Sequence, residues 1–347
     1  MTKVSDSISQ AALPPLVILT GPTAAGKTAL SVALAKAVGG EIISADSMQV
    51  YRHMDIGSAK VTKEEMDGVP HHLIDVLDPE EEFNVVLFQT LAKKAIADIL
   101  SRGRLPIQVG GTGFYIQSVL YDIDFTQTKE DGGYRRELEE IAREKGAHYL
   151  HGMLAQADPE AAGQIHENNV KRVIRALEYH AQTGEKISAH NEEQRRSEAA
   201  YRFRYFVLTD ERAKLYERID RRVDKMLEAG LLEEVRALKE RGLQKGMVSM
   251  QGLGYKEILA YLDGEYDLER AVYLIKRDTR HFAKRQLTWF KREKNVTWVD
   301  RSAFLDENSI FMLRWEFPAR FTDTGKRRSR RLPPVLKKST GWRNITS

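Results

Sequence analysis

One eight-residue segment near the amino terminus constrains the fold more than any other part of this sequence. It matches the pattern G-x-x-x-x-G-K-[ST] and reads Gly21-Pro22-Thr23-Ala24-Ala25-Gly26-Lys27-Thr28. The apolar run 16–19 precedes it, and the Ala- and Leu-rich stretch 29–38 follows it. A buried strand, a glycine-containing loop and a helix in this order are the setting in which this motif binds phosphate groups. We therefore expect an anion site at this loop.

The residues of this loop have different expected roles. Glycines let the backbone turn, so that successive N–H groups and the helix N-terminus point at the anion. Lys27 adds a mobile positive charge, and the Thr28 hydroxyl is a ligand for Mg²⁺. The motif predicts binding of a polyphosphate or pyrophosphate group and does not specify ATP. The predicted diphosphate-binding residues in the loop are Gly21, Thr23, Ala24, Ala25, Gly26, Lys27 and Thr28.

Short apolar segments alternate with helical patterns over most of the chain. Expected strands are 16–19, 41–44, 105–109, 205–208 and 296–299. Expected helices are 29–38, 85–102, 134–145, 147–156, 169–183, 212–229, 231–241 and 267–294. This pattern predicts an α/β fold: a P-loop NTPase-like parallel sheet flanked by helices, with an inserted all-helical subdomain and C-terminal helices.

The same pattern predicts five consecutive segments. A flexible leader covers residues 1–14, and the first part of the P-loop core covers 15–125. A helical insert at 126–200 interrupts the core, which resumes at 201–300 with further helices. The remaining residues, 301–347, form a C-terminal extension whose basic part, from 325 onward, we expect to be disordered.

Composition and charge exclude several classes of protein. The formal net charge of the 347 residues is +4, but residues 326–347 contain eight basic residues and no acid. The rest of the chain therefore carries a net charge of −4, and the overall charge does not by itself indicate a nucleic-acid surface. The chain has no cysteine, which excludes disulfides and thiolate chemistry. No signal peptide and no run of 18 apolar residues is present, so we expect a cytoplasmic protein without a membrane anchor.

Acidic residues near strand ends bear on the chemistry. An NTPase needs an acid after another apolar strand, but the segment 105–109 is followed by Gly110-Gly111-Thr112, and Asp75 follows only a short apolar run. The sequence does not favour nucleotide hydrolysis. Asp46 follows the second strand, and the ends of parallel strands converge on one crevice. A carboxylate beside an anion site raises the electrostatic energy of that site, so its presence suggests that Asp46 accepts a proton or binds a metal. The alternative is that Asp46 only caps a helix or turn.

Several further blocks occur in a characteristic order. They are Asp46-Ser47-Met48-Gln49-Val50-Tyr51, Pro70-His71-His72-Leu73-Ile74-Asp75, Gly110-Gly111-Thr112-Gly113-Phe114-Tyr115, Arg218-Ile219-Asp220-Arg221-Arg222-Val223, Gly252-Leu253-Gly254-Tyr255-Lys256-Glu257 and Lys284-Arg285-Gln286-Leu287-Thr288-Trp289-Phe290. Together with the phosphate loop, this set closely resembles the bacterial tRNA dimethylallyltransferases. The resemblance covers about residues 15–300, and it is the whole set that is specific.

The resemblance implies transfer of a dimethylallyl group from dimethylallyl diphosphate to the exocyclic amine of the adenosine just 3′ of the anticodon, with pyrophosphate leaving. Asp46 would accept a hydrogen bond or proton from the amine, and Thr112 would lie near the reacting centre. Arg222, together with Arg218 and Mg²⁺, would neutralise the pyrophosphate. On a charged helix, the alternative for both arginines is a solvated salt bridge. The adenosine would flip out of its stack, and Gln49 would read its edge.

The resemblance also implies a surface for the tRNA anticodon stem-loop, whose phosphates basic side chains would contact. The implied residues are Asp46, Ser47, Met48, Gln49, Lys171, Arg172, Arg175, Gln251, Gly254, Lys256, Arg280, Lys284, Arg285 and Gln286. A charged helix is otherwise usually a solvated face. The family suggests a monomer.

Two alternative functions remain open from the sequence. The first is a P-loop kinase, or an isopentenyltransferase that acts on free adenine nucleotides. A free-nucleotide enzyme has less need for the helical insert and the basic helix, and a kinase needs the acid that is missing after the segment 105–109. The second is a nucleotide-regulated RNA-binding protein without catalytic activity.

Overall fold

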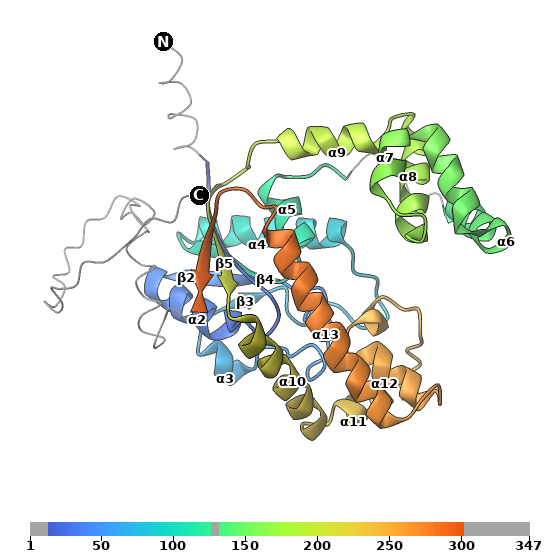
Figure 1. Cartoon of the computed structure of the whole chain (residues 1–347). Helices are drawn as coiled ribbons and strands as arrows, with labels where there is room; N and C mark the ends of the chain where they lie inside the picture. Colours follow the sequence, from blue (N-terminus) through green and yellow to red (C-terminus); the bar gives the residue numbers. More distant parts are fainter. Residues whose placement is uncertain (1–12, 126–131, 302–347) are drawn as a thin grey trace, which may run out of the picture.

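A six-stranded parallel sheet forms the centre of the molecule, in a computed structural model that describes residues 13–125 and 132–301 (Figure 1). Its strand order is β3-β2-β4-β1-β5-β6, and each neighbouring pair is parallel. The strands are β1 (Pro15–Thr20), β2 (Gly40–Ala45), β3 (His71–His72), β4 (Leu105–Gly110), β5 (Arg202–Thr209) and β6 (Val296–Asp300). The predicted α/β fold class is confirmed.

Residues 16–19 of the central strand β1 are all apolar because both faces of the sheet are covered. Leu16 and Ile18 pack into one hydrophobic cluster, with residues of α4 (Val85–Ser101) and α5 (Gly113–Leu120). Val17 and Leu19 point to the opposite face and pack against α2 (Lys27–Val38). Successive side chains of a strand alternate between faces, so a continuous apolar run is what a doubly covered strand requires.

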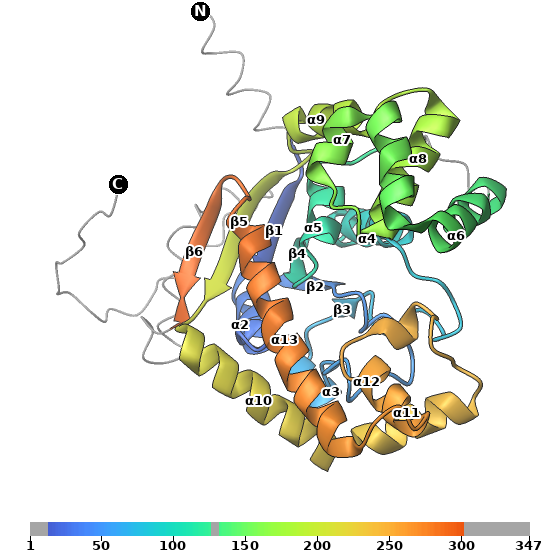
Figure 2. The same ribbon diagram turned by 45° about the vertical axis from the view of Figure 1, so that its right-hand side comes forward.

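The remaining helices of the core follow β2 and β5. They are α3 (Lys63–Met66), α10 (Arg212–Glu228), α11 (Leu231–Glu240), α12 (Tyr255–Leu262) and α13 (Leu268–Phe290), with a short 3₁₀ turn at Ser249–Gln251. Figure 2 shows α13 running alongside α10, with α11 and α12 beside its amino-terminal end. The sequence predicted α10, α11 and α13 within a few residues. It missed α12, and it missed β3, because two residues are too few to form a recognisable pattern.

The segment between α5 and β5 is helical, as predicted, and has a hydrophobic cluster of its own. It comprises α6 (Gly132–Ala157), α7 (Pro159–Gln164), α8 (Val170–Thr183) and α9 (Ile187–Arg196), which lie together at the top of both views (Figures 1 and 2). The two helices expected at 134–145 and 147–156 are the two halves of α6, which breaks at Gly146 (φ 86°). The buried Asp158 joins α7 to α9 by accepting hydrogen bonds from the Ala161 and Ser188 N–H groups.

Other predictions fall outside the described residues. These are the leader, except for its last two residues, the chain around the predicted start of the insert at 126–131, and the extension from 302 onward with its basic tail. Among the helices of the described ranges, none combines the length and the apolar character needed to cross a membrane.

A partly buried carboxyl group, that of Glu293, lies just after the end of α13. Glu293 accepts a hydrogen bond from Gln117 Nε2 at 2.8 Å. Burial raises its pKa from 4.5 to about 7, against the opposing effect of this hydrogen bond. The unfolded chain therefore loses this proton at a lower pH than the folded chain, so the folded state loses stability as the pH rises from about 4.5 to about 7.

We predict that Glu293→Gln stabilises the protein at pH 8 and changes its stability little at pH 5. The amide of the new side chain still accepts the hydrogen bond from Gln117. It does not ionise, so the folded state no longer loses the stability, up to about 3 kcal/mol, that ionisation of Glu293 costs above neutral pH. Urea unfolding of both proteins at the two pH values measures this difference. An equal effect at pH 5 and pH 8 would contradict the assignment.

Candidate active site

The phosphate loop joins β1 to α2 through three residues with positive φ. These are Gly21 (φ 148°), Ala24 (φ 62°) and Gly26 (φ 84°), which is the N-cap of α2. A Cβ atom on Gly21 would lie 2.7 Å from the carbonyl oxygen of Leu208, so no larger residue fits there without movement. The motif thus forms the tight turn that the sequence predicted, directly before the first turn of a helix.

Lys27 lies inside this loop. Its ammonium donates hydrogen bonds to the carbonyls of Gly21 (3.0 Å) and Pro22 (2.9 Å). Its pKa is lowered to about 8, mainly by burial and also by the Arg222 guanidinium, whereas Asp46 opposes the shift. An anion bound at the loop must compete with the two carbonyls for this ammonium.

The two predicted arginines of α10 lie in different surroundings. Arg222 lines the cavity described below and donates from Nη1 to the Thr23 hydroxyl at 3.3 Å. Burial lowers its pKa, and Asp46 opposes that shift. Arg218 instead donates to the carbonyl of Ala24 (3.0 Å) and to the buried carboxylate of Asp210 (2.6 Å). Arg218 therefore holds the loop from outside the cavity.

Gln286 connects the phosphate loop to the sheet. Its Oε1 accepts from the Thr23 N–H at 2.9 Å, and its Nε2 donates to the Gly111 carbonyl at 2.9 Å. The side chain is buried, and a Cβ on Gly111 would lie 2.1 Å from its nitrogen. The amide of this predicted tRNA-binding residue is thus engaged inside the protein on both sides. The helix α13 that carries it is linked to two strand ends at once.

Asp46 lies where the strand topology predicted it, and Thr112 lies just after the end of a neighbouring strand. Asp46 follows β2, and its Oδ1 accepts from the Met48 N–H at 2.9 Å, which turns the chain back after the strand. Thr112 follows β4, and its N–H donates to the Ala45 carbonyl at 3.4 Å. Gln49 donates from Nε2 to the Ala59 carbonyl at 3.2 Å. Three neighbouring strand ends therefore contribute to one site.

A cavity of about 480 Å³ brings many of the predicted residues together. The predicted residues that line it are Thr23, Ala24, Lys27, Thr28, Asp46, Ser47, Met48, Gln49, Thr112, Arg222, Gln251, Lys256, Arg285 and Gln286. Apolar side chains complete the lining, among them Phe83, Tyr115, Ile219, Val223 and Ile275. The cavity therefore combines cations from the loop and α10, one carboxylate from the end of β2, and an apolar wall, in a volume typical of small-molecule sites.

Other predicted residues lie elsewhere. Lys171, Arg172 and Arg175 are exposed on α8. Arg280 forms an ion pair with Asp220, and Gly254 is the N-cap of α12. Lys284 lies on the exposed side of α13, in a separate open groove of about 450 Å³. The residues lining this groove are His281, Lys284, Arg285, Thr288, Trp289 and Arg292, so Arg285 lines both the groove and the cavity.

Some contributors gave no sequence signal. Arg301, after β6, donates to the Ala25 carbonyl at 3.4 Å. Gly57, Ser58 and Ala59 form part of the cavity wall through a loop without regular structure. Contacts of this kind come from side chains and backbone atoms that only the folded chain brings together.

The donors in the cavity fit a magnesium ion that is shared with a substrate. The Thr28 hydroxyl and the Asp46 carboxylate both line the cavity. In residues 13–125 and 132–301, no group of three or more His, Asp or Glu side chains could hold a metal ion. Mg²⁺ is usually bound through one or two protein oxygens, waters and substrate phosphates, so this sparse donor set suits it.

Comparisons with known proteins agree with this geometry. Residues 49–293 match the family model described as IPP transferase, and residues 14–79 match that described as isopentenyl transferase. The tRNA dimethylallyltransferase of Lachnoclostridium phytofermentans is 64% identical over 298 residues, which cover 86% of this chain and 95% of the relative. That of Carboxydothermus hydrogenoformans is 54% identical over 285 residues, covering 82% of this chain and 91% of the relative.

Two solved structures share the fold. The tRNA isopentenylpyrophosphate transferase of Bacillus halodurans is 47% identical with a TM-score of 0.67, and the match covers 89% of this chain and 97% of that one. A eukaryotic dimethylallyltransferase acting on tRNA is 31% identical with a TM-score of 0.72, covering 88% of this chain and 77% of that one. With its phosphate loop, strand-end carboxylate and these relatives, the chain belongs to the IPP transferase family.

Proposed function

We propose that this chain transfers a dimethylallyl group from dimethylallyl diphosphate to the exocyclic amine of the adenosine 3′-adjacent to the anticodon in tRNAs. The observation that carries this proposal is the cavity in which Lys27 and Arg222 share one space with Asp46 and Thr112. The C–O bond of the allylic diphosphate breaks, a C–N bond forms to the amine, and the amine loses a proton. Pyrophosphate leaves. The names of the relatives support the same reaction.

The phosphate loop and α10 bind the diphosphate of the donor. An allylic diphosphate ionises more easily when charge on the departing pyrophosphate is neutralised. Lys27 turns from its two loop carbonyls toward the phosphates, and Arg222 supplies a second cation from α10. Gly21, Ala25 and Gly26 shape the backbone that presents N–H groups. Arg218 acts as a positioning residue through the Ala24 carbonyl.

The residues after β2 and β4 contact the acceptor adenosine. Asp46 accepts the amine proton as the C–N bond forms. Thr112 lies beside the reacting atoms, and Gln49 reads the edge of the base. An adenosine stacked in an anticodon loop cannot reach an enclosed cavity, so the nucleotide enters flipped out of its stack.

The donor set of the cavity suits Mg²⁺, with the Thr28 hydroxyl as its protein ligand and the diphosphate oxygens as the others. When bound, the ion neutralises charge on the pyrophosphate.

The pattern of ion pairs on α13 supports an RNA surface. Lys276, Arg277 and Arg280, toward its amino-terminal end, pair with Asp224, Asp278 and Asp220. Farther along the helix, no ion pair within the described residues involves Lys284 or Arg285. Both side chains line an open groove beside Trp289, and the Arg285 guanidinium also lies over the Phe282 ring, 5.7 Å from its centroid. Unpaired cations beside an aromatic side chain suit the phosphates and unstacked bases of an RNA loop.

Three further regions complete the proposed tRNA contacts. Lys171, Arg172 and Arg175 offer exposed charge on α8 of the helical unit, and no ion pair of the described chain uses them. Gln251 and Lys256 lie in the cavity lining, and Gly254 begins the helix that carries Lys256. Gln286 contributes indirectly, because it fixes the phosphate loop.

The direct test is a product assay. The protein is incubated with Mg²⁺, dimethylallyl diphosphate and unmodified tRNA, and the digested RNA is analysed by mass spectrometry, with AMP and ATP offered as acceptors in parallel. We expect dimethylallyladenosine from tRNA only. Prenylation of free nucleotides would favour a cytokinin-type enzyme, and ATP turnover without prenylation would contradict the proposal.

We predict that Asp46→Asn lowers kcat by roughly 10²- to 10⁴-fold, the usual contribution of a general base. Binding of tRNA should change by less than about twofold in a filter-binding assay, because one cavity carboxylate contributes little to an extended RNA surface. The matched control is Asp98→Asn on the exposed face of α4, which should retain full turnover. Full turnover in Asp46→Asn would remove Asp46 from the reaction.

The lowered pKa of Lys27 predicts a pH dependence of diphosphate binding. The anion binds the ammonium form, so the dissociation constant of pyrophosphate should rise above pH 8, approaching about tenfold per pH unit. Lys27→Arg keeps its charge and should lack this rise. Isothermal titration calorimetry measures this dissociation constant for both proteins from pH 7 to 9.5. Because pyrophosphate itself titrates equally in the same buffers, the difference between the two proteins reports Lys27. Parallel curves for the two proteins would contradict the prediction.

A further inference from the structure

One wall of the cavity is a loop that follows β2 and has no regular secondary structure. Gly57, Ser58 and Ala59 line the cavity from this loop. A wall built from irregular backbone keeps its shape only if its polar groups are bound by other parts of the protein. The contacts that bind this loop come from two directions.

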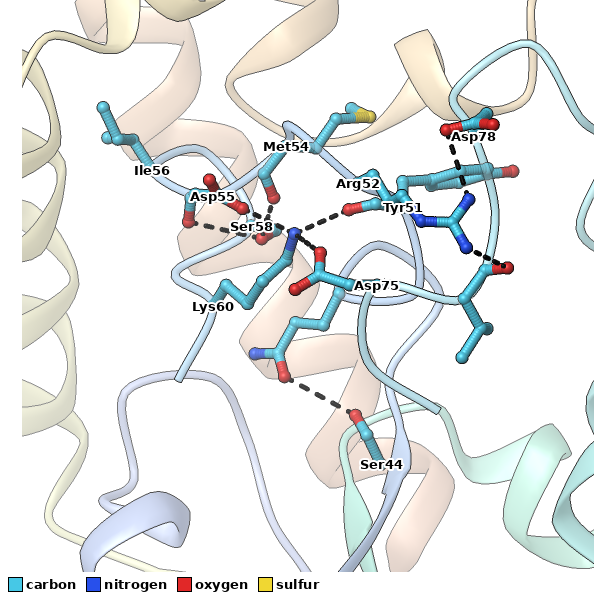
Figure 3. A network of polar contacts seen from close by, with 12 residues as sticks. Ser44, Tyr51, Arg52, Met54, Asp55, Ile56, Ser58, Lys60, Asp75 and Asp78 are labelled. Carbon is cyan, nitrogen blue, oxygen red and sulfur yellow. Dashed lines mark hydrogen bonds and ion pairs between the residues drawn. The ribbon is translucent and has the colours of Figure 1, made fainter. Parts of the chain in front are cut away.

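The first set of contacts centres on Lys60. Figure 3 shows its ammonium between Asp55, Asp75 and the backbone of Tyr51. Each of the three distances is 2.6 Å, and the Lys60 side chain is only 6% exposed. One buried cation thus joins both ends of the loop to the segment after β3. These partners all lie within residues 51–75, so this part of the loop is held locally.

The second set comes from a distant carboxylate. Glu234 on α11 accepts from the N–H groups of Asp55 (2.9 Å) and Ile56 (2.8 Å) at one oxygen. Its other oxygen accepts from the Gly57 N–H at 3.0 Å. Three successive backbone donors therefore end on one carboxylate. Charge-assisted bonds of this kind are stronger than bonds between neutral groups.

Tyr255 on α12 extends this arrangement by one residue. Its hydroxyl donates to Glu234 at 2.8 Å and accepts from the Ser58 N–H at 3.1 Å. Burial raises the pKa of Tyr255, so the phenol keeps the proton that it donates. A Cβ on Gly57 would lie 2.6 Å from the Tyr255 ring, which shows how closely the loop backbone lies against it. The N–H groups of residues 55–58 are all bound by these two side chains.

The loop in turn orients Gln49. Its Nε2 donates to the carbonyl of Ala59, the residue directly after the four bound N–H groups. Its Oε1 lies 3.5 Å from the Ser44 hydroxyl. A shift of the loop backbone would move the Ala59 carbonyl and release the Gln49 amide to rotate. The chain of contacts thus runs from α11 and α12, through the backbone, to a polar side chain inside the cavity.

We propose that Glu234 and Tyr255, which do not line the cavity themselves, are positioning residues that orient Gln49 toward the acceptor base. This inference rests on the proposed function, since it assigns the cavity beside Gln49 to a purine. Apolar packing alone would join α11 and α12 to the core, because Leu231, Val235 and Ile258 are buried there. A partly buried carboxylate that receives four hydrogen bonds specifies the conformation of the loop in addition.

The test compares Glu234→Gln with Glu233→Gln. Both variants remove one negative charge from α11, but Glu233 is exposed and pairs only with Arg236 in the described chain. In Glu234→Gln an amide NH₂ group faces the backbone donors. We expect kcat/KM for tRNA to fall roughly 10- to 100-fold, because a small displacement of a group that orients the substrate slows a reaction by this order. The KM for dimethylallyl diphosphate should stay within about twofold of the wild-type value. Glu233→Gln should match the wild-type protein.

A double-mutant cycle separates positioning from general destabilisation. In a Gln49→Ala background, Glu234→Gln should cause little further loss, because the side chain that it orients is gone. An equal loss with and without Gln49 would overturn the inference, and so would wild-type kinetics in Glu234→Gln. Should Glu234→Gln fail to fold, Tyr255→Phe, which removes only one hydroxyl, replaces it in the cycle. Absence of prenyl transfer by the wild-type protein would instead contradict the proposed function.

Discussion

The phosphate loop imposes one constraint on the rest of the structure: a backbone that points its N–H groups at an anion must have its carbonyl groups bound elsewhere. Here cationic side chains bind them, one from the loop itself and two from distant parts of the chain. Lys27 takes two carbonyls within the loop, Arg218 of α10 takes that of Ala24, and Arg301 after β6 takes that of Ala25. Gln286 of α13 binds the Thr23 N–H. The first thirty residues begin the site, and helices more than 180 residues later complete it.

The cavity contains cations for the diphosphate and a carboxylate for the acceptor amine of the proposed reaction. Lys27 and Arg222 lie close enough for the guanidinium to lower the pKa of the ammonium, while Asp46 raises the pKa of both groups. A bound diphosphate adds negative charge on the cation side and so favours the protonated form of Lys27. In the proposed reaction, Asp46 then accepts the proton that leaves the amine. The proposed alkyl transfer relies on electrostatic stabilisation and one carboxylate, whereas hydrolysis of a nucleotide needs a different set of groups.

The sequence predicted the parts of the fold that follow from local pattern. The apolar runs predicted five of the six strands. Parallel topology placed Asp46 beside the phosphate loop, and the family resemblance placed Thr112 there. The sequence could not predict which partners the polar group at the end of a long side chain binds. Gln286 resembles an RNA contact in sequence but binds the protein backbone on both sides. Arg218 is bound by Asp210 and the Ala24 carbonyl, whereas Arg222 lines the cavity. Glu234 binds backbone N–H groups, which no residue pattern reveals.

The proposed reaction requires that one cavity hold the diphosphate on Lys27 and Arg222 and the acceptor amine on Asp46. A crystal structure of the protein with an unreactive thiolodiphosphate analogue of the donor and an anticodon stem-loop RNA tests it most directly. We predict phosphate oxygens within hydrogen-bonding distance of the Lys27 ammonium and the Arg222 guanidinium, and the adenine amine within the same distance of the Asp46 carboxylate. A diphosphate bound away from the loop, or an adenosine that remains stacked outside the cavity, would contradict it.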